Sequence, residues 1–178
     1  MLFGKQSIPV PEIAAIGHGH ISWQQIRSHL PKDVWNTYFK FGFVRNPFDR
    51  FVSTCFFLNR DNINFKGREV EFMQEAIHRK KFQQRILVVP QSHLLVDENS
   101  KVMMDYVGRF EELQPSYDDI CKHIGIPSAK LSSKNISHHD NYSRYYDTTL
   151  QKSVAEFYQS DFEVFGYNPL DSFSNHES

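Results

Sequence analysis

The sequence has little cysteine, no long hydrophobic run and no excess of charge of one sign. Its two cysteines, Cys55 and Cys121, stand among apolar or helix-forming neighbours, which argues against a disulfide framework or a cysteine-based metal site and predicts two buried free thiols. No apolar run approaches the roughly 18–20 residues of a membrane span, and the N-terminus lacks a signal-peptide pattern. We therefore expect a soluble chain.

The charges nearly balance, with 20 Lys and Arg against 21 Asp and Glu and a net charge of −1. This balance argues against a nucleic-acid binder built on bulk positive charge, so any anion site must be local. The 178 residues, 40% hydrophobic and including 16 Phe, predict one globular domain with a Phe-rich core. We expect an irregular arm over residues 1–12 and a frayed tail over residues 171–178.

Local patterns predict the main elements. Ser22 and Gln25 form a capping-box pattern for a helix that should end near Leu30, before Pro31. Residues 37–44 are aromatic and β-branched, as in a buried parallel strand. Further helices are expected over residues 69–81, 116–125 and 148–159, and the last of these should have Thr148 and Gln151 as its capping box. The turn residues 97–101 should separate two strand-like runs, 94–96 and 102–109.

The strongest functional pattern is FVRNPFDRFVS at residues 43–53. Asn46 is a good N-cap and Pro47 suits a first helical turn, so a strand, a short loop and a helix follow one another. Arg45 would then lie at the carboxyl end of a strand, where α/β sheets bind ligands, and Ser53 two turns into the helix. Arg45 could grip a phosphate while Ser53 donates its hydroxyl. An equal alternative is that Arg45 and Arg50 make ordinary salt bridges and Ser53 has no special role.

This segment closely resembles the 3′-phosphate-binding motif of sulfotransferases that use 3′-phosphoadenylyl sulfate (PAPS), in particular the carbohydrate-sulfotransferase-like branch. Three other segments resemble parts of that branch in the right order: residues 17–20 (GHGH), 107–113 (VGRFEEL) and 161–167 (DFEVFGY). The resemblance spans about residues 17–167.

The resemblance implies an α/β fold, a P-loop-NTPase-like parallel sheet flanked by helices. It also implies that Arg45 and Ser53 bind the 3′-phosphate of PAPS, and that His20, or less favourably His18, is the general base for an acceptor hydroxyl. The acceptor would be a carbohydrate or glycoconjugate and the nucleotide product adenosine 3′,5′-bisphosphate (PAP). A neutral imidazole suits proton removal near pH 7.

The family's first strand and its Lys-containing loop for the 5′-phosphosulfate should precede the histidine segment and are not recognisable. Residues 4–7 (GKQS) hold a Lys and a Ser without the glycine spacing of a P-loop. We therefore expect an N-terminally truncated version of the fold. Two hypotheses remain, a PAPS-dependent sulfotransferase and a catalytically inactive module that binds PAP or PAPS; a nucleotide kinase is disfavoured because no Walker A pattern is visible.

A long polar and aromatic loop over residues 128–147 is a second candidate site, in which Arg144 could hold a phosphate or the adenine ring. A solvated surface loop is an equal alternative. A zinc site from His18, His20, His138 and His139 is disfavoured because no acidic or Cys partner has a suitable spacing, so no metal is expected. We expect a cytoplasmic protein, or a Golgi-lumen one if an anchor segment is missing, and a homo-oligomer is possible on the exposed sheet edge.

Overall fold

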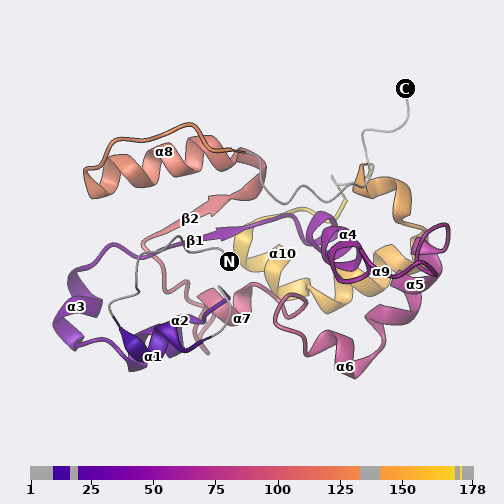
Figure 1. Ribbon diagram of the computed structural model, residues 1–178, viewed down its shortest axis with the longest axis horizontal. Coiled ribbons are helices and arrows are strands. Elements are labelled where there is room, and N and C mark those ends of the chain that lie inside the picture. The colour runs from indigo at the N-terminus through magenta and orange to yellow at the C-terminus, as the bar shows by residue number, and fades with distance from the viewer. Residues whose placement is uncertain (1–9, 17–19, 133–140, 171–172, 174–178) are drawn as a thin grey trace.

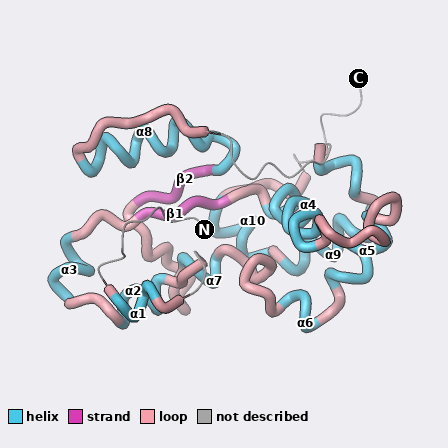
Figure 2. Tube along the Cα trace, in the orientation of Figure 1, coloured by secondary structure: helices cyan, strands magenta, loops and turns pink. Residues whose placement is uncertain are grey.

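A computed structural model describes residues 10–16, 20–132, 141–170 and 173 of the chain. The fold is mixed α/β, as expected, with a small parallel sheet among helices (Figures 1 and 2). Among the described residues the sheet has two strands, β1 (Phe41–Val44) and β2 (Tyr106–Arg109), paired from Phe41 opposite Tyr106 to Val44 opposite Arg109. Both carboxyl ends therefore lie at the same edge of the sheet.

The helices of the described chain surround this sheet. They are α1 (Pro11–Ala14), α2 (Trp23–Ser28), α3 (Lys32–Thr37), α4 (Pro47–Leu58), α5 (Glu69–Ile77), α6 (Lys80–Gln83), α7 (Ser92–Leu95), α8 (Leu113–Ile124), α9 (Thr148–Phe157) and α10 (Gln159–Phe165), with 3₁₀ turns η1 (Phe110–Glu112) and η2 (Tyr142–Tyr145). In Figure 1, α8 lies on one side of the sheet, and α7 and α10 on the other. The α1–α3 group lies toward the amino end of β1 and the α4, α5 and α9 group beyond its carboxyl end. No described helix combines the length and apolar character that a bilayer crossing requires.

The core is rich in Phe and centres on α4. Phe48, Phe51, Val52 and Cys55 of this helix are buried and form its apolar face. They belong to one cluster with Met73 and Ile77 of α5, Leu150 and Val154 of α9, and Tyr158 and Phe162 near the start of α10. Cys55 and Cys121 are both buried free thiols, as predicted. Burial raises the pKa of the Cys55 thiol, so it stays protonated.

Several predicted helix signals are confirmed. Ser22 and Gln25 form the reciprocal capping box of α2, with Ser22 Oγ accepting from the Gln25 N–H at 3.3 Å. Asn46 caps α4 because its Oδ1 accepts the Phe48 N–H at 2.9 Å. Gly125 ends α8 in the left-handed conformation with φ 73°, where a side chain would be strained. The turn at residues 97–101 closes with a hydrogen bond from the Asp97 N–H to the Lys101 carbonyl.

Other boundaries differ from the sequence predictions. Thr37, expected to start the strand, ends helix α3, where its Oγ1 donates to the Asp33 carbonyl at 2.7 Å. Residues 38–40 lie in neither element, and β1 begins only at Phe41. Leu95 ends α7, and only Val96 pairs with Val102 in an isolated bridge.

Further corrections concern the later helices and the N-terminal arm. The predicted helix over residues 69–81 is split into α5 and α6, and α8 starts at Leu113, three residues before Ser116. Asp147 caps α9, where Thr148 was expected, because its carboxylate accepts the Leu150 N–H at 2.7 Å. Pro11 and Glu12 lie in α1 and so are helical; residues 1–9 and most of residues 171–178 lie outside the described chain.

Candidate functional site

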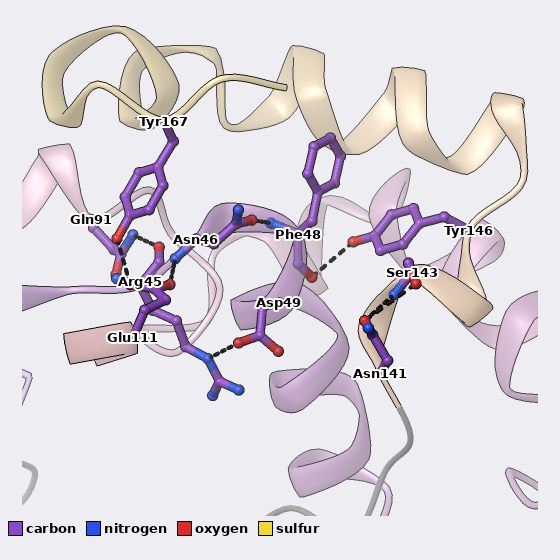
Figure 3. Close-up of polar contacts among 10 residues, drawn as sticks. All are labelled: Arg45, Asn46, Phe48, Asp49, Gln91, Glu111, Asn141, Ser143, Tyr146 and Tyr167. Carbon is purple, nitrogen blue, oxygen red and sulfur yellow. Dashed lines mark hydrogen bonds and ion pairs between the residues drawn. The ribbon is translucent and has the colours of Figure 1, made fainter. Parts of the chain in front are cut away.

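The residues at the carboxyl end of β1 are held by a side-chain amide from another part of the chain. The Arg45 N–H donates to Gln91 Oε1 at 2.9 Å, and Gln91 Nε2 donates back to the Arg45 carbonyl at 2.9 Å (Figure 3). This pair of bonds replaces the ladder bonds that a neighbouring strand would supply. The backbone of Arg45 is therefore fixed just before α4 begins.

Gln91 is in turn held by Asp161 on α10. Asp161 is fully buried, and its carboxylate accepts the backbone N–H groups of Gln91 and Ser92, each at 2.8 Å. It also lies 3.3 Å from Gln91 Nε2. Charge-assisted bonds of this kind are stronger than neutral ones, so Asp161 fixes the amide that holds Arg45.

The next residue, Asn46, is held by Glu111 of η1, which directly follows β2. Its N–H donates to Glu111 Oε1 at 2.6 Å, and Glu111 Oε2 accepts the Tyr167 hydroxyl at 3.0 Å (Figure 3). Burial, followed by the nearby Glu111 carboxylate, raises the pKa of Tyr167, so its hydroxyl remains a donor. The Arg109 guanidinium lies 4.4 Å from the Tyr167 ring centre and donates to the Phe165 carbonyl at 2.8 Å.

The Arg45 side chain is oriented by two neighbours. Its Nε donates to Oδ2 of Asp49, in the first turn of α4, at 2.6 Å. Its guanidinium carbon lies 4.5 Å from the Phe110 ring centre. The Arg45 and Asp49 side chains are 20% and 19% exposed, so the pair is partly shielded from water. Within the described chain the Nη atoms have no hydrogen-bond partner, which leaves the outer edge of the guanidinium for an anion.

The structure brings Ser53 to the same side of α4 as this ion pair. Ser53 follows Asp49 by four residues, one turn along the same face of the helix, and is half-buried. Arg50 has a different role, because it donates to the Val89 carbonyl at 2.9 Å and packs on the Tyr158 ring. The alternative of an ordinary salt bridge is thus met by Arg45, whose Nε pairs with Asp49, whereas Arg50 forms no ion pair among the described residues.

His20 lies just before α2 and is half-buried, whereas His18 lies outside the described residues. The α2 helix is anchored by Trp23, whose Nε1 donates to the Val96 carbonyl at 3.0 Å, at the C-cap of α7. The other end of α7 follows Gln91, which holds Arg45. The four-residue helix α7 therefore links the segment that carries His20 to the Arg45 loop.

Arg144 is exposed on η2, and this turn packs beside α4. The Tyr146 hydroxyl donates to the Phe48 carbonyl at 3.0 Å, and the Tyr145 ring lies 5.1 Å from that of Phe56 (Figure 3 shows Tyr146). Arg144 is thus carried by a segment docked on the helix that carries Ser53. His138 and His139 lie outside the described residues, and no cluster of potential metal ligands occurs among the described ones.

Sequence reasoning missed the residues that hold Arg45 and Asn46 in place. Glu111 and Tyr167 do lie in the segments 107–113 and 161–167 that carry the resemblance, as does Asp161. The structure explains why these segments occur together: their polar side chains converge, directly or through Gln91, on the Arg45–Asn46 backbone. Gln91 has no local signal, because its role depends on a contact 46 residues away.

Comparison with known proteins identifies a family for the chain. The chain is 26% identical over 124 residues to an uncharacterized protein of Archaeoglobus fulgidus, a match that covers 67% of this chain and 94% of the relative. No solved structure matches the chain significantly. The model of the sulfotransferase family matches residues 13–168, which include every element from β1 to α10. The chain belongs to the sulfotransferase family.

Proposed function

We propose that the chain transfers a sulfuryl group from PAPS to a hydroxyl of a carbohydrate or glycoconjugate. Arg45 and Ser53 bind the 3′-phosphate of the donor, Arg144 contributes to nucleotide binding, and His20 is the general base, with His18 as the alternative. The parallel sheet with helices on both sides fits the P-loop-like fold that the family resemblance implies.

In this reaction the base removes the proton of the acceptor hydroxyl as its oxygen attacks the sulfur of PAPS. The new S–O bond forms while the bond between sulfur and the phosphate oxygen of PAPS breaks, and PAP leaves with the electron pair. Positioning and charge stabilisation supply most of the rate in such transfers. A general base within hydrogen-bond reach contributes about 10²- to 10⁴-fold.

The observation that carries the proposal is the environment of Arg45. The backbone is fixed at Arg45 and Asn46, and the Arg45 side chain is held by the Asp49 carboxylate at Nε and by the Phe110 ring beside the guanidinium. The outer edge of the guanidinium is left open, on the face of α4 that also bears Ser53. A guanidinium edge binds phosphate with two parallel hydrogen bonds, and holding it in advance lowers the entropy lost on binding.

The first test is calorimetric titration with PAP and with adenosine 5′-monophosphate. We expect binding that requires the 3′-phosphate and weakens by about 1.5–3 kcal/mol in Arg45→Ala, the usual contribution of a hydrogen bond to a charged group. Arg68→Ala is the matched control, because Arg68 also pairs with a nearby carboxylate, Glu71, and lies 5.8 Å from the Phe72 ring centre. Equal affinity for both nucleotides, or equal loss in both variants, would refute the 3′-phosphate site.

A second test separates catalysis from binding. We expect His20→Ala to lower PAP release from PAPS by about 10²- to 10⁴-fold, in the presence of a panel of oligosaccharides, while PAP affinity stays the same. His29→Ala, at the C-cap of α2, is the control. Full turnover in His20→Ala would move the base to another residue, and PAP binding without turnover in the unaltered chain would favour the inactive binding module.

A further inference from the structure

A small pocket lies beside the C-terminal end of α4, where that helix and the loop after it meet α5 and the region of α6 (Figure 1). Its volume is about 150 Å³. Protein cavities of roughly this volume with Leu, Ile and Phe walls bind benzene, so one aromatic ring fits the space. The pocket lies at the opposite end of α4 from Arg45, and neither Arg45 nor Ser53 lines it.

The inner wall of the pocket is apolar and uncharged. It is formed by Cys55 of α4, Phe65 of the loop and Ala76 of α5, each of which is at most 9% exposed. Burial raises the pKa of the Cys55 thiol, so this side chain carries no charge. An apolar group that reaches this wall leaves water without burying an unpaired charge.

Two further phenylalanine rings line the pocket, and both are held by neighbouring rings. The ring centre of Phe72 lies 5.7 Å from that of Phe65 with the planes at 78°, and the ring centre of Phe82 lies 6.2 Å from that of Phe51 with the planes at 83°. Phe72 and Phe82 are half-buried, so each retains surface that a ligand can contact. An aromatic ligand can add to this edge-to-face arrangement, which aromatic pairs favour.

The exposed residues that line the pocket are both arginines, Arg79 and Arg85, so they stand at its mouth. Arg79 pairs with Glu75, whereas Arg85 forms no ion pair within the described chain. None of the described lining residues is acidic. The side-chain amide of Asn59, which also lines the pocket, already donates to the Cys55 carbonyl at 2.9 Å. The guanidinium of Arg85 is therefore the polar group best placed to recognise a ligand.

We propose that this pocket binds a small aromatic carboxylate. The ring enters among Phe65, Phe72 and Phe82, and the carboxylate stays at the mouth, where Arg85 pairs with it. The volume suits one ring better than a long acyl chain. The site requires neither a nucleotide nor sulfuryl transfer, so it does not depend on the function proposed for Arg45.

The test titrates 4-fluorobenzoate with the full chain and follows the fluorine resonance of the ligand by NMR, which detects weak binding. We expect a saturable change in the resonance and an affinity that falls as salt rises. The uncharged 4-fluorobenzamide has the same ring and should bind at least about tenfold more weakly, because it lacks the charge that Arg85 recognises. Acetate has the carboxylate without the ring and should not displace the probe at equal concentration.

An arginine variant tests the recognition of the carboxylate. Arg85→Gln should raise the Kd for 4-fluorobenzoate by at least about tenfold, and the fold should remain intact because Arg85 is exposed. Arg27→Gln is the matched control, since Arg27 is also exposed, forms no ion pair within the described chain and lies on α2, outside the pocket. It should change the Kd by less than about twofold.

A second variant tests the place of the ring. Ala76→Leu adds a larger side chain to the inner wall and should abolish detectable binding of 4-fluorobenzoate. Far-UV circular dichroism and thermal unfolding establish whether this variant is folded, and Arg85→Gln tests the proposal independently if it is not. Undiminished binding by folded Ala76→Leu would overturn the proposal.

Other outcomes would also overturn it: no change in the resonance with a folded chain, equal binding of 4-fluorobenzamide, or an equal loss in Arg27→Gln. Tighter binding of octanoate than of 4-fluorobenzoate would mean that the pocket takes an acyl chain. A further arm adds saturating PAP, which should leave the Kd of the probe unchanged. Displacement of the probe by PAP would make its site a nucleotide site, whereas absence of PAP binding would refute only the Arg45 site.

Discussion

At the scale of single residues, Asp161 makes the contact with the largest expected contribution to stability near the site. Its buried carboxylate accepts two backbone N–H groups at 2.8 Å, and an amide in its place would turn one acceptor into a donor facing an N–H. We expect Asp161→Asn to lower the free energy of unfolding by about 2–3 kcal/mol, measured by urea denaturation. Glu163→Gln, an exposed change two residues away that keeps an acceptor for Gln159, should alter it by less than about 0.5 kcal/mol. Equal stability of the two variants would contradict this role.

Also at this scale, the sequence indicates the residues that we propose to bind the ligand, but not the residues that hold them in place. Arg45 and Ser53 stand in one contiguous pattern, where strand, N-cap and helix signals can be read locally. Gln91 and Glu111 act through contacts 46 and 65 residues apart along the chain. Such contacts depend on how the elements pack, and no local propensity encodes them.

At the scale of elements, the capping residue of α9 is Asp147 in the structure, whereas the sequence pattern favoured Thr148. Asp147 accepts the Leu150 N–H at 2.7 Å and also the Gln74 amide at 2.6 Å, which joins α9 to α5. Asp147→Ala should therefore lower the free energy of unfolding by about 1–2 kcal/mol. Thr148→Ala, at the position that the sequence pattern favoured, should have less than half of this effect. Thermal unfolding measures both, and a larger effect of Thr148→Ala would restore the original assignment.

The elements that the sequence predicted well share a feature: each has a cap and an apolar stripe of several turns. Helix α4 combines Asn46, Pro47 and a buried face of Phe48, Phe51 and Cys55, so its local and tertiary signals agree. Helix α3 has only six residues and one buried side chain, Trp35. No sequence pattern predicted this helix, and its one buried indole packs against Trp23, a contact that exists only in the folded chain.

At the scale of the whole molecule, chain segments distant in sequence meet around the end of β1. Arg45 is bonded to Gln91, just before α7, and Gln91 is bonded to Asp161 of α10. Asn46 is bonded to Glu111 of η1, and Glu111 is bonded to Tyr167, just after α10. A ligand that binds the Arg45 guanidinium therefore stabilises an arrangement that exists only when these segments are folded together. Ligand binding and global stability should consequently be coupled.

This coupling gives a prediction for the intact chain. PAP at about 100 times its Kd should stabilise the folded state by about 2.7 kcal/mol, because it binds the folded chain and not the unfolded one. For a chain of this size that corresponds to a rise in Tm of roughly 5–10 °C, measured by calorimetry. Arg45→Ala should lose most of the rise at the same PAP concentration, whereas Arg68→Ala, which removes the separate Arg68–Glu71 pair, should keep it. Adenosine 5′-monophosphate should produce little rise, since it lacks the 3′-phosphate. A full rise in Arg45→Ala would mean that the nucleotide binds elsewhere, and the convergence of segments on Arg45 would then be purely structural.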